Sequence, residues 1–137
     1  MKKYIFIVSL LCLLAACTGK RQGEAAVEVA ALPAVEDVVM YQVNPRVFAP
    51  EKSFKAVERR LDSIQALGIN VVWFMPINEV GQEKSVNSPY CVKDYKGVNP
   101  EFGTLDEFKA LVATCHQKGM NVIIDWVANH TSRDNAW

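Results

Sequence analysis

The stretch TLDEFKALVATCHQKGMNVIID, residues 104–125, predicts one helix followed by one buried strand, which is the unit of an α/β fold. Thr104 and Glu107 have the spacing of a capping box, in which two side chains satisfy free N–H groups of the first turn. Apolar residues then recur at helical spacing, namely Leu105, Phe108, Leu111, Val112 and Cys115. Gly119 ends the helix. Residues 121–124 follow as a strand, with Asp125 at its carboxyl end.

The same pattern occurs once more upstream. A predicted helix over residues 54–67 has Ser53 as its N-cap and Gly68 as its C-terminal stop. Its apolar positions recur at helical spacing and are Phe54, Val57, Leu61, Ile64 and Leu67. Residues 38–43 and 69–75 are nearly continuous apolar runs, which predicts strands buried on both faces. The element order is therefore β-α-β-α-β.

Two α/β architectures fit this order, an open doubly wound sheet and a closed (β/α)8 barrel. The doubly wound fold usually carries a glycine-rich turn after its first strand, and residues 44–47, NPRV, contain no glycine. The loops after the strands are long and the connections after the helices are short, as in barrel enzymes. A whole barrel needs about 200 residues or more. We therefore expect an incomplete (β/α)8 TIM barrel with three strands and two helices, and a truncated chain.

Composition excludes some functions. The chain has 15 basic and 15 acidic residues and a formal net charge of zero, so it lacks the basic surface of a nucleic-acid binder. Of the four cysteines, Cys91 and Cys115 lie in the predicted barrel part, and no CxxC pair or metal-type spacing occurs. Whether these two cysteines pair is left open by the sequence.

The first residues are typical of an export signal. Lys2 and Lys3 precede an apolar run over residues 4–16, which is too short for a bilayer span of about 20 residues. The run ends in small residues followed directly by Cys17, which resembles a bacterial lipobox. We expect a lipoprotein signal over 1–16, lipidation of Cys17, a tether over 17–36 and the barrel part over 37–137. The expected location is the cell envelope, with the outer membrane favoured because Thr18 is not Asp.

Candidate functional residues lie after the strands. Asp125, Asn129 and His130 cluster just past the third strand. Tyr90 and Tyr95 lie in the long predicted loop over residues 76–103, and a phenol ring can stack on a sugar while its hydroxyl hydrogen-bonds it. Polar loops are common, so spacing alone leaves a structural role open for each. We interpret Tyr95 as a residue that packs this loop and Trp73, in mid-strand, as a core residue.

These motifs resemble the alpha-amylase family, glycoside hydrolase family 13. Residues 125–130, DWVANH, resemble its D-x-x-x-N-H signature at the end of the third barrel strand. Residues 68–76 resemble its second strand with G, W and P in order, and residues 88–95 and 99–104, SPYCVKDY and NPEFGT, resemble the following loop. The resemblance covers about 100 residues, from Asp37 to Trp137.

The resemblance implies specific roles. Tyr90 would stack on the sugar on the non-reducing side of the cleaved bond, and His130 would hydrogen-bond the same sugar. Asp125 would organise the site by binding a downstream arginine. The residue matching Asn129 holds a structural calcium in many members, and others lack that ion. No other cofactor is expected.

The family's nucleophile, acid/base and stabilising carboxylate follow later strands, so the catalytic residues are expected beyond Trp137. The resemblance implies a retaining hydrolase of α-glucosidic bonds, acting on starch-like glucans or maltooligosaccharides. The chain alone is expected to be inactive. One alternative is a non-catalytic carbohydrate-binding lipoprotein with the same barrel, and another is a remnant whose gene ends at Trp137. The exact substrate, and hydrolysis against glycosyl transfer, remain open.

Overall fold

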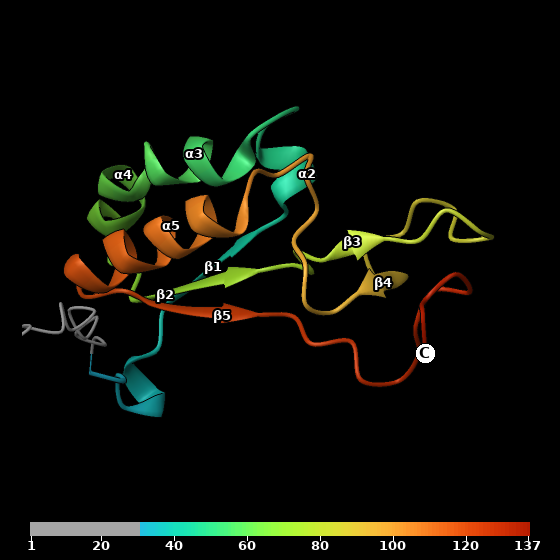
Figure 1. Ribbon diagram of the computed structural model, residues 1–137. Helices are drawn as coiled ribbons and strands as arrows, with labels where there is room; N and C mark the ends of the chain where they lie inside the picture. Colours follow the sequence, from blue (N-terminus) through green and yellow to red (C-terminus); the bar gives the residue numbers. More distant parts are fainter. Residues whose placement is uncertain (1–30) are drawn as a thin grey trace, which may run out of the picture.

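The computed structural model describes residues 31–137 and contains one parallel sheet of three strands (Figure 1). The strands are β1 (Met40–Val43), β2 (Val71–Phe74) and β5 (Asn121–Ile124), in the spatial order β1-β2-β5. Val43 pairs with Phe74, and Phe74 pairs with Ile124, so the three carboxyl ends lie at one edge. This is part of a (β/α)8 barrel that is not closed, which confirms the predicted fold class.

The helices pack on one face of this sheet. They are α3 (Ser53–Glu58), α4 (Leu61–Ala66) and α5 (Leu105–Gln117), and Figure 1 shows all three on the same side of the sheet. Shorter elements complete the described chain: the 3-10 turn η2 (Val35–Asp37), α2 (Pro45–Phe48), β3 (Glu79–Val80) and β4 (Val92–Asp94). The predicted capping box of α5 is confirmed, with Glu107 N–H donating to Thr104 Oγ1 at 3.1 Å and Thr104 N–H donating to Glu107 Oε2 at 2.9 Å.

The single helix predicted over residues 54–67 is wrong, because the structure divides it into α3 and α4 at a turn after Glu58. Ser53 is also not the N-cap. That position is taken by Lys52, which adopts the left-handed conformation at φ 49°. The reason is a contact with the distant loop, since Phe54 N–H donates to the carbonyl of Phe102 at 3.0 Å. That carbonyl takes the place of a side-chain cap.

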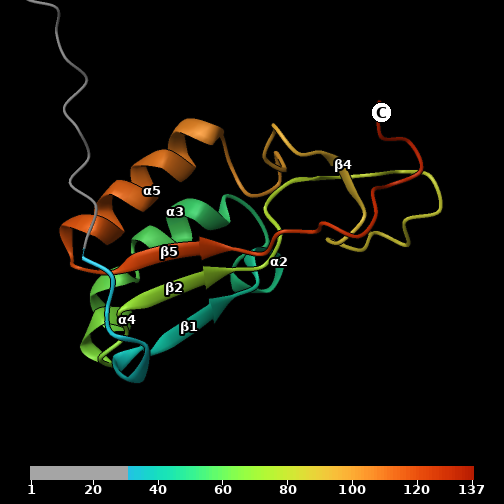
Figure 2. The same ribbon diagram turned by 90° about the horizontal axis from the view of Figure 1, so that it is seen from below.

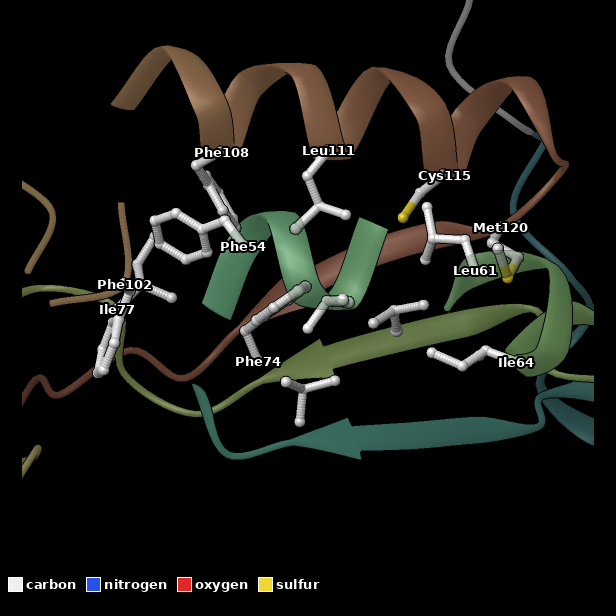
Figure 3. Packing of buried hydrophobic residues seen from close by; sticks show 13 residues of the cluster. Phe54, Leu61, Ile64, Phe74, Ile77, Phe102, Phe108, Leu111, Cys115 and Met120 are labelled. Carbon is white, nitrogen blue, oxygen red and sulfur yellow. The ribbon is translucent and has the colours of Figure 1, made fainter. Parts of the chain in front are cut away.

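The core lies between the helices and the sheet (Figure 3). Phe54 of α3, Phe74 of β2 and Phe108 of α5 meet there, with ring centroids 5.0 Å apart for Phe54–Phe108 and 5.5 Å for Phe74–Phe108. Leu111 and Cys115 extend the same buried face along α5. Apolar burial of this kind contributes about 1.5–3 kcal/mol for each large side chain.

The other face of the sheet is uncovered, so the prediction that the strands are buried on both faces is wrong for the described residues. Alternation and register place Gln42, Trp73 and Ile123 on that face. Gln42 is exposed, Trp73 is half-buried, and Ile123 retains 44% of its accessible surface. In a closed barrel this face is covered by side chains of the other strands, and three strands cannot supply them. The interpretation of Trp73 as a core residue is corrected with it, because Trp73 is only half-buried.

The described residues before β1, which include the end of the predicted tether, contact the amino ends of the other two strands. Asn121 donates to the carbonyl of Ala31 at 3.2 Å. Asn70 accepts from Val39 N–H at 2.9 Å and donates to the carbonyl of Asp37 at 2.7 Å. The predicted signal over 1–16 and Cys17 lie outside the described residues. Within residues 31–137, no helix has the length and apolar character needed to cross a membrane.

Candidate functional site

The segment between β2 and α5, residues 75–104, extends beyond the carboxyl ends of the sheet strands (Figures 1 and 2) and is called the arm below. Within it, β3 and β4 pair antiparallel, a feature that the sequence prediction of a plain loop missed. Asn78 donates to the carbonyls of Tyr95 at 3.3 Å and of Gly97 at 3.0 Å, which closes the base of the arm. The arm therefore holds Tyr90 and Tyr95 in place beside the ends of the strands.

The last residues, 131–137, pack on this arm. Ser132 N–H donates to the carbonyl of Val92 at 2.9 Å, and Gln82 N–H donates to Asp134 Oδ2 at 2.9 Å. The bond from Gln82 is the main reason that the pKa of Asp134 lies below its ordinary value. Gly81 is needed here because a Cβ at this residue would lie 2.3 Å from Asp134 Oδ1. The segment after β5 is thus fixed by contacts with a part of the chain about 50 residues away.

Asp125 directly follows β5 and contacts both β2 and the arm. Its backbone N–H donates to the carbonyl of Phe74 on β2 at 2.8 Å. Its carboxylate accepts from Trp73 Nε1–H at 2.5 Å and from the hydroxyl of Tyr90 at 2.8 Å, one donor on each oxygen. The predicted site residues Asp125 and Tyr90 are therefore brought into direct contact.

The contact with Asp125 changes the pKa of Tyr90. The hydrogen bond to Asp125 is the largest cause that raises the pKa of Tyr90, followed by burial and by the repulsion between a phenolate and the Asp125 charge. The phenol remains protonated at neutral pH and acts as a donor. Tyr90 retains 38% of its accessible surface, so a part of the residue is open to a ligand.

His130 and Asn129 lie on the segment after β5, and both side chains are exposed. Asn129 Nδ2 lies 3.4 Å from His130 Nδ1. The hydroxyl of Tyr95 lies 2.7 Å from the carbonyl oxygen of Val127 and 2.9 Å from that of His130, so it holds the backbone of this segment. This agrees with the interpretation of Tyr95 as a packing residue.

Two hollows border these residues. One, of about 430 Å³, is lined by Asn129, His130 and the rings of Tyr95, Trp126 and Trp137. The other, of about 390 Å³, is lined in part by Asp125, Trp126 and Tyr95. Tyr90 lines neither. The four predicted residues therefore share one edge of the sheet without sharing one pocket.

Trp73 is the residue that sequence reasoning missed. Its position in mid-strand indicated a core residue, and its indole N–H instead reaches the carboxylate of Asp125. A signal was available in principle, because a Trp on a strand needs a partner for its N–H when it is partly buried. Only strand pairing shows that this partner is Asp125, since the two residues are 52 positions apart.

The cysteines and the possible metal ligands of the described residues add little chemistry to this site. Cys91 and Cys115 are both free, and burial raises the pKa of the Cys115 thiol to about 12, which makes it inert. Calcium takes six to eight oxygen ligands. Within residues 31–137, no three or more His, Cys, Asp or Glu side chains are placed to share a metal.

The parallel strands, the helices on one face and the polar residues at the carboxyl ends define this chain as part of a (β/α)8 barrel. It belongs to the alpha-amylase catalytic-domain family, whose model matches residues 52–137. An alpha-amylase from Lactobacillus plantarum has a similar crystal structure, with a TM-score of 0.68 and 41% identity over 73% of this chain. The oligo-1,6-glucosidase of Halalkalibacterium halodurans is 33% identical over 74% of this chain, and the amino acid transporter heavy chain of Homo sapiens is 38% identical over 72%.

The chain spans only a part of each of these proteins. It covers 24% of the alpha-amylase chain, 18% of the oligo-1,6-glucosidase and 15% of the transporter heavy chain. Two of these three proteins are named as glycoside-cleaving enzymes, and the third is named as a heavy chain of an amino acid transporter.

Proposed function

We propose that residues 37–137 are the first part of a glycoside hydrolase barrel that cleaves α-glucosidic bonds of starch-like glucans or maltooligosaccharides with retention. In this proposal Tyr90 stacks on the sugar before the cleaved bond and His130 hydrogen-bonds it. Asp125 and Asn129 organise the site around them. The nucleophile, the acid/base and the stabilising carboxylate come from strands that follow residue 137, so residues 1–137 alone release no sugar.

The observation that carries this proposal is the hydrogen bond between Tyr90 and Asp125. It joins the arm and the end of β5, the two segments that the family resemblance assigns to the sugar site. The bond leaves the ring of Tyr90 partly exposed, as a stacking platform requires. The alpha-amylase and the oligo-1,6-glucosidase that the chain resembles support the substrate class.

A second candidate function is a non-catalytic barrel that binds carbohydrate or a partner protein. The similarity to the amino acid transporter heavy chain favours it, because that relative is as similar in sequence as the glucosidase. The two proposals differ in the residues after the later strands. A retained Asp, Glu and Asp at these strand ends support the hydrolase, and the loss of any one of them supports the binding protein.

The test is an assay of the protein from its complete reading frame beside residues 1–137 and a Tyr90→Ala variant. Release of reducing sugar from starch and maltooligosaccharides is measured for each. Activity in the complete protein, loss in Tyr90→Ala and none in residues 1–137 are the expected results. Glucan binding without release would overturn the hydrolase proposal in favour of the binding protein.

The cellular location is part of the same proposal. Cys17, directly after small residues, is proposed as the acylated N-terminus that holds the protein to the cell envelope, with the outer membrane favoured. Metabolic labelling with a radioactive fatty acid tests this. The native protein should take up label and fractionate with membranes, whereas Cys17→Ala should do neither.

Calcium dependence is tested in the same preparation. A structural calcium near Asn129 would take oxygen ligands, which include backbone and amide carbonyls as well as carboxylates. The thermal midpoint of the complete protein with and without a calcium chelator decides whether such an ion contributes to folding. An unchanged midpoint rules out a structural calcium.

A further inference from the structure

We propose that Trp73 is a positioning residue of the candidate site: its indole N–H fixes the carboxylate of Asp125, and through that carboxylate the phenol of Tyr90. The indole Nε1–H lies 2.5 Å from Asp125 Oδ1, and the hydroxyl of Tyr90 lies 2.8 Å from Asp125 Oδ2. The three side chains come from β2, from the end of β5 and from the arm.

The strand register makes this contact a consequence of the fold. Trp73 pairs with Ile123, two residues before Asp125 on the neighbouring strand. The bond from Asp125 N–H to the carbonyl of Phe74 then fixes the backbone of Asp125 against β2. The indole on the uncovered face is therefore held within reach of the carboxylate, independently of the arm.

Trp73 is less exposed than the other two tryptophans. Trp126 and Trp137 are 82% and 90% exposed, so water can satisfy their N–H groups. Trp73 is half-buried in mid-strand, and its donor is satisfied by a charged acceptor. A hydrogen bond to a charged group is stronger than one between neutral groups. A partly buried indole needs an acceptor, and here that acceptor is the carboxylate that also accepts from Tyr90.

The positioning role of Trp73 follows from the effect of removing its N–H donor on the carboxylate of Asp125. A phenylalanine at residue 73 can fill most of the space and cannot donate to Asp125 Oδ1. The carboxylate is then free to rotate toward water and to release the hydroxyl of Tyr90. The ring of Tyr90 would lose its anchor, and the sugar-stacking role, which rests on the proposed function, would weaken with it.

The first test uses nuclear magnetic resonance of the complete protein with ¹⁵N-labelled tryptophan. The signal that is missing in Trp73→Phe identifies the Trp73 indole. In Asp125→Asn, where Trp73 is intact, this signal should move upfield because a neutral amide is a weaker acceptor than a carboxylate. The signal of Trp137 serves as the control and should stay in place. An unmoved Trp73 signal would overturn the proposal.

The second test measures the pKa of Tyr90 as the difference in ultraviolet titration between each background and its Tyr90→Phe partner. Trp73→Phe should lower this raised pKa toward the ordinary value of about 10, whereas Trp126→Phe should leave it raised. If Trp73→Phe leaves the pKa of Tyr90 unchanged, Trp73 only packs.

A kinetic measurement then links the position to the reaction. Misplacement of a reacting group by a distant change costs up to about a hundredfold in rate, so Trp73→Phe should lower kcat/KM for maltooligosaccharides about tenfold or more. Unchanged kinetics in an active enzyme would overturn the positioning role. If the complete protein cleaves no glucan, the proposed function fails, while the two spectroscopic tests still decide the role of Trp73.

Discussion

Tyr95 holds the backbone of His130: its hydroxyl lies 2.9 Å from the carbonyl oxygen of His130 and 2.7 Å from that of Val127. The contact joins the arm to the segment after β5 across 35 positions of sequence. One side of the Tyr95 ring also stacks on Trp137, with centroids 5.3 Å apart and planes 18° from parallel. The place of the His130 side chain therefore depends on a residue that need not touch a ligand.

Tyr95→Phe tests this dependence. The variant keeps the ring and loses one donor to two carbonyls, which should lower the free energy of unfolding by about 1 kcal/mol. It should also raise KM for maltooligosaccharides, because His130 is less well placed. Tyr41→Phe is the matched control, because Tyr41 lies in β1 and packs against the hydrophobic core. Equal effects of the two variants on KM would refute the link to His130.

Gly81→Ala should detach the segment 132–134 from the arm. A Cβ at this residue would lie 2.3 Å from both Asp134 Oδ1 and the Cβ of Ser132, so the two parts must separate. The expected loss of stability is about 1–3 kcal/mol, the usual cost of overpacking. Trypsin should then cut faster after Arg133. Gly97→Ala is the control, because its nearest neighbour is the end of the Asp94 side chain at 3.0 Å.

The Tyr90–Asp125 bond predicts a pH dependence. The pKa of Tyr90 is raised in the folded state, so the bond contributes fully below the ordinary tyrosine pKa of about 10. This contribution is lost as the pH rises through the higher folded value. Asp125→Asn removes the charge and should return the pKa toward about 10. A titration in which Asp125→Asn leaves the Tyr90 pKa raised would contradict the assignment.

The start of α5 offers a stability test away from the site. Thr104→Ala removes the side-chain acceptor for Glu107 N–H and should cost about 1 kcal/mol, whereas Thr104→Ser should retain most of the stability. The pKa of Glu107 is lowered, chiefly by the Thr104 N–H and then by Lys55. The stabilisation contributed by the ionised Glu107 carboxylate is therefore present above the ordinary glutamate pKa, and it is lost as the pH falls through the lower pKa of the folded state. Chemical denaturation at neutral and acidic pH measures both effects.

Local patterns in the sequence predicted the elements well wherever short-range rules decide. The capping box at Thr104 and Glu107 is present in the structure, because both partners lie in one helical turn. The runs around residues 38–43, 69–75 and 121–124 contain the three observed strands. The break between α3 and α4 was not predictable from apolar spacing, since Val57 and Leu61 stay buried on both sides of the turn.

The candidate site was predictable only in part. The motif around Asp125 and His130, and Tyr90 in the long loop, placed residues at the correct edge of the sheet. The sequence could not show the antiparallel pairing of β3 and β4, since short polar segments carry little periodicity. It also could not show that Tyr90 reaches Asp125 while His130 lines a separate hollow.

The alternation of helices with parallel strands, and the polar residues at the strand ends, could be inferred from the amino-acid sequence alone. Hydrophobic periodicity and capping act within a few residues, so they can be followed along the chain. The sharing of the Asp125 carboxylate by Trp73 and Tyr90 became visible in the three-dimensional structure alone. Those contacts join positions 35 and 52 residues apart, and their geometry arises from strand register and from the packing of the arm, which no local pattern encodes.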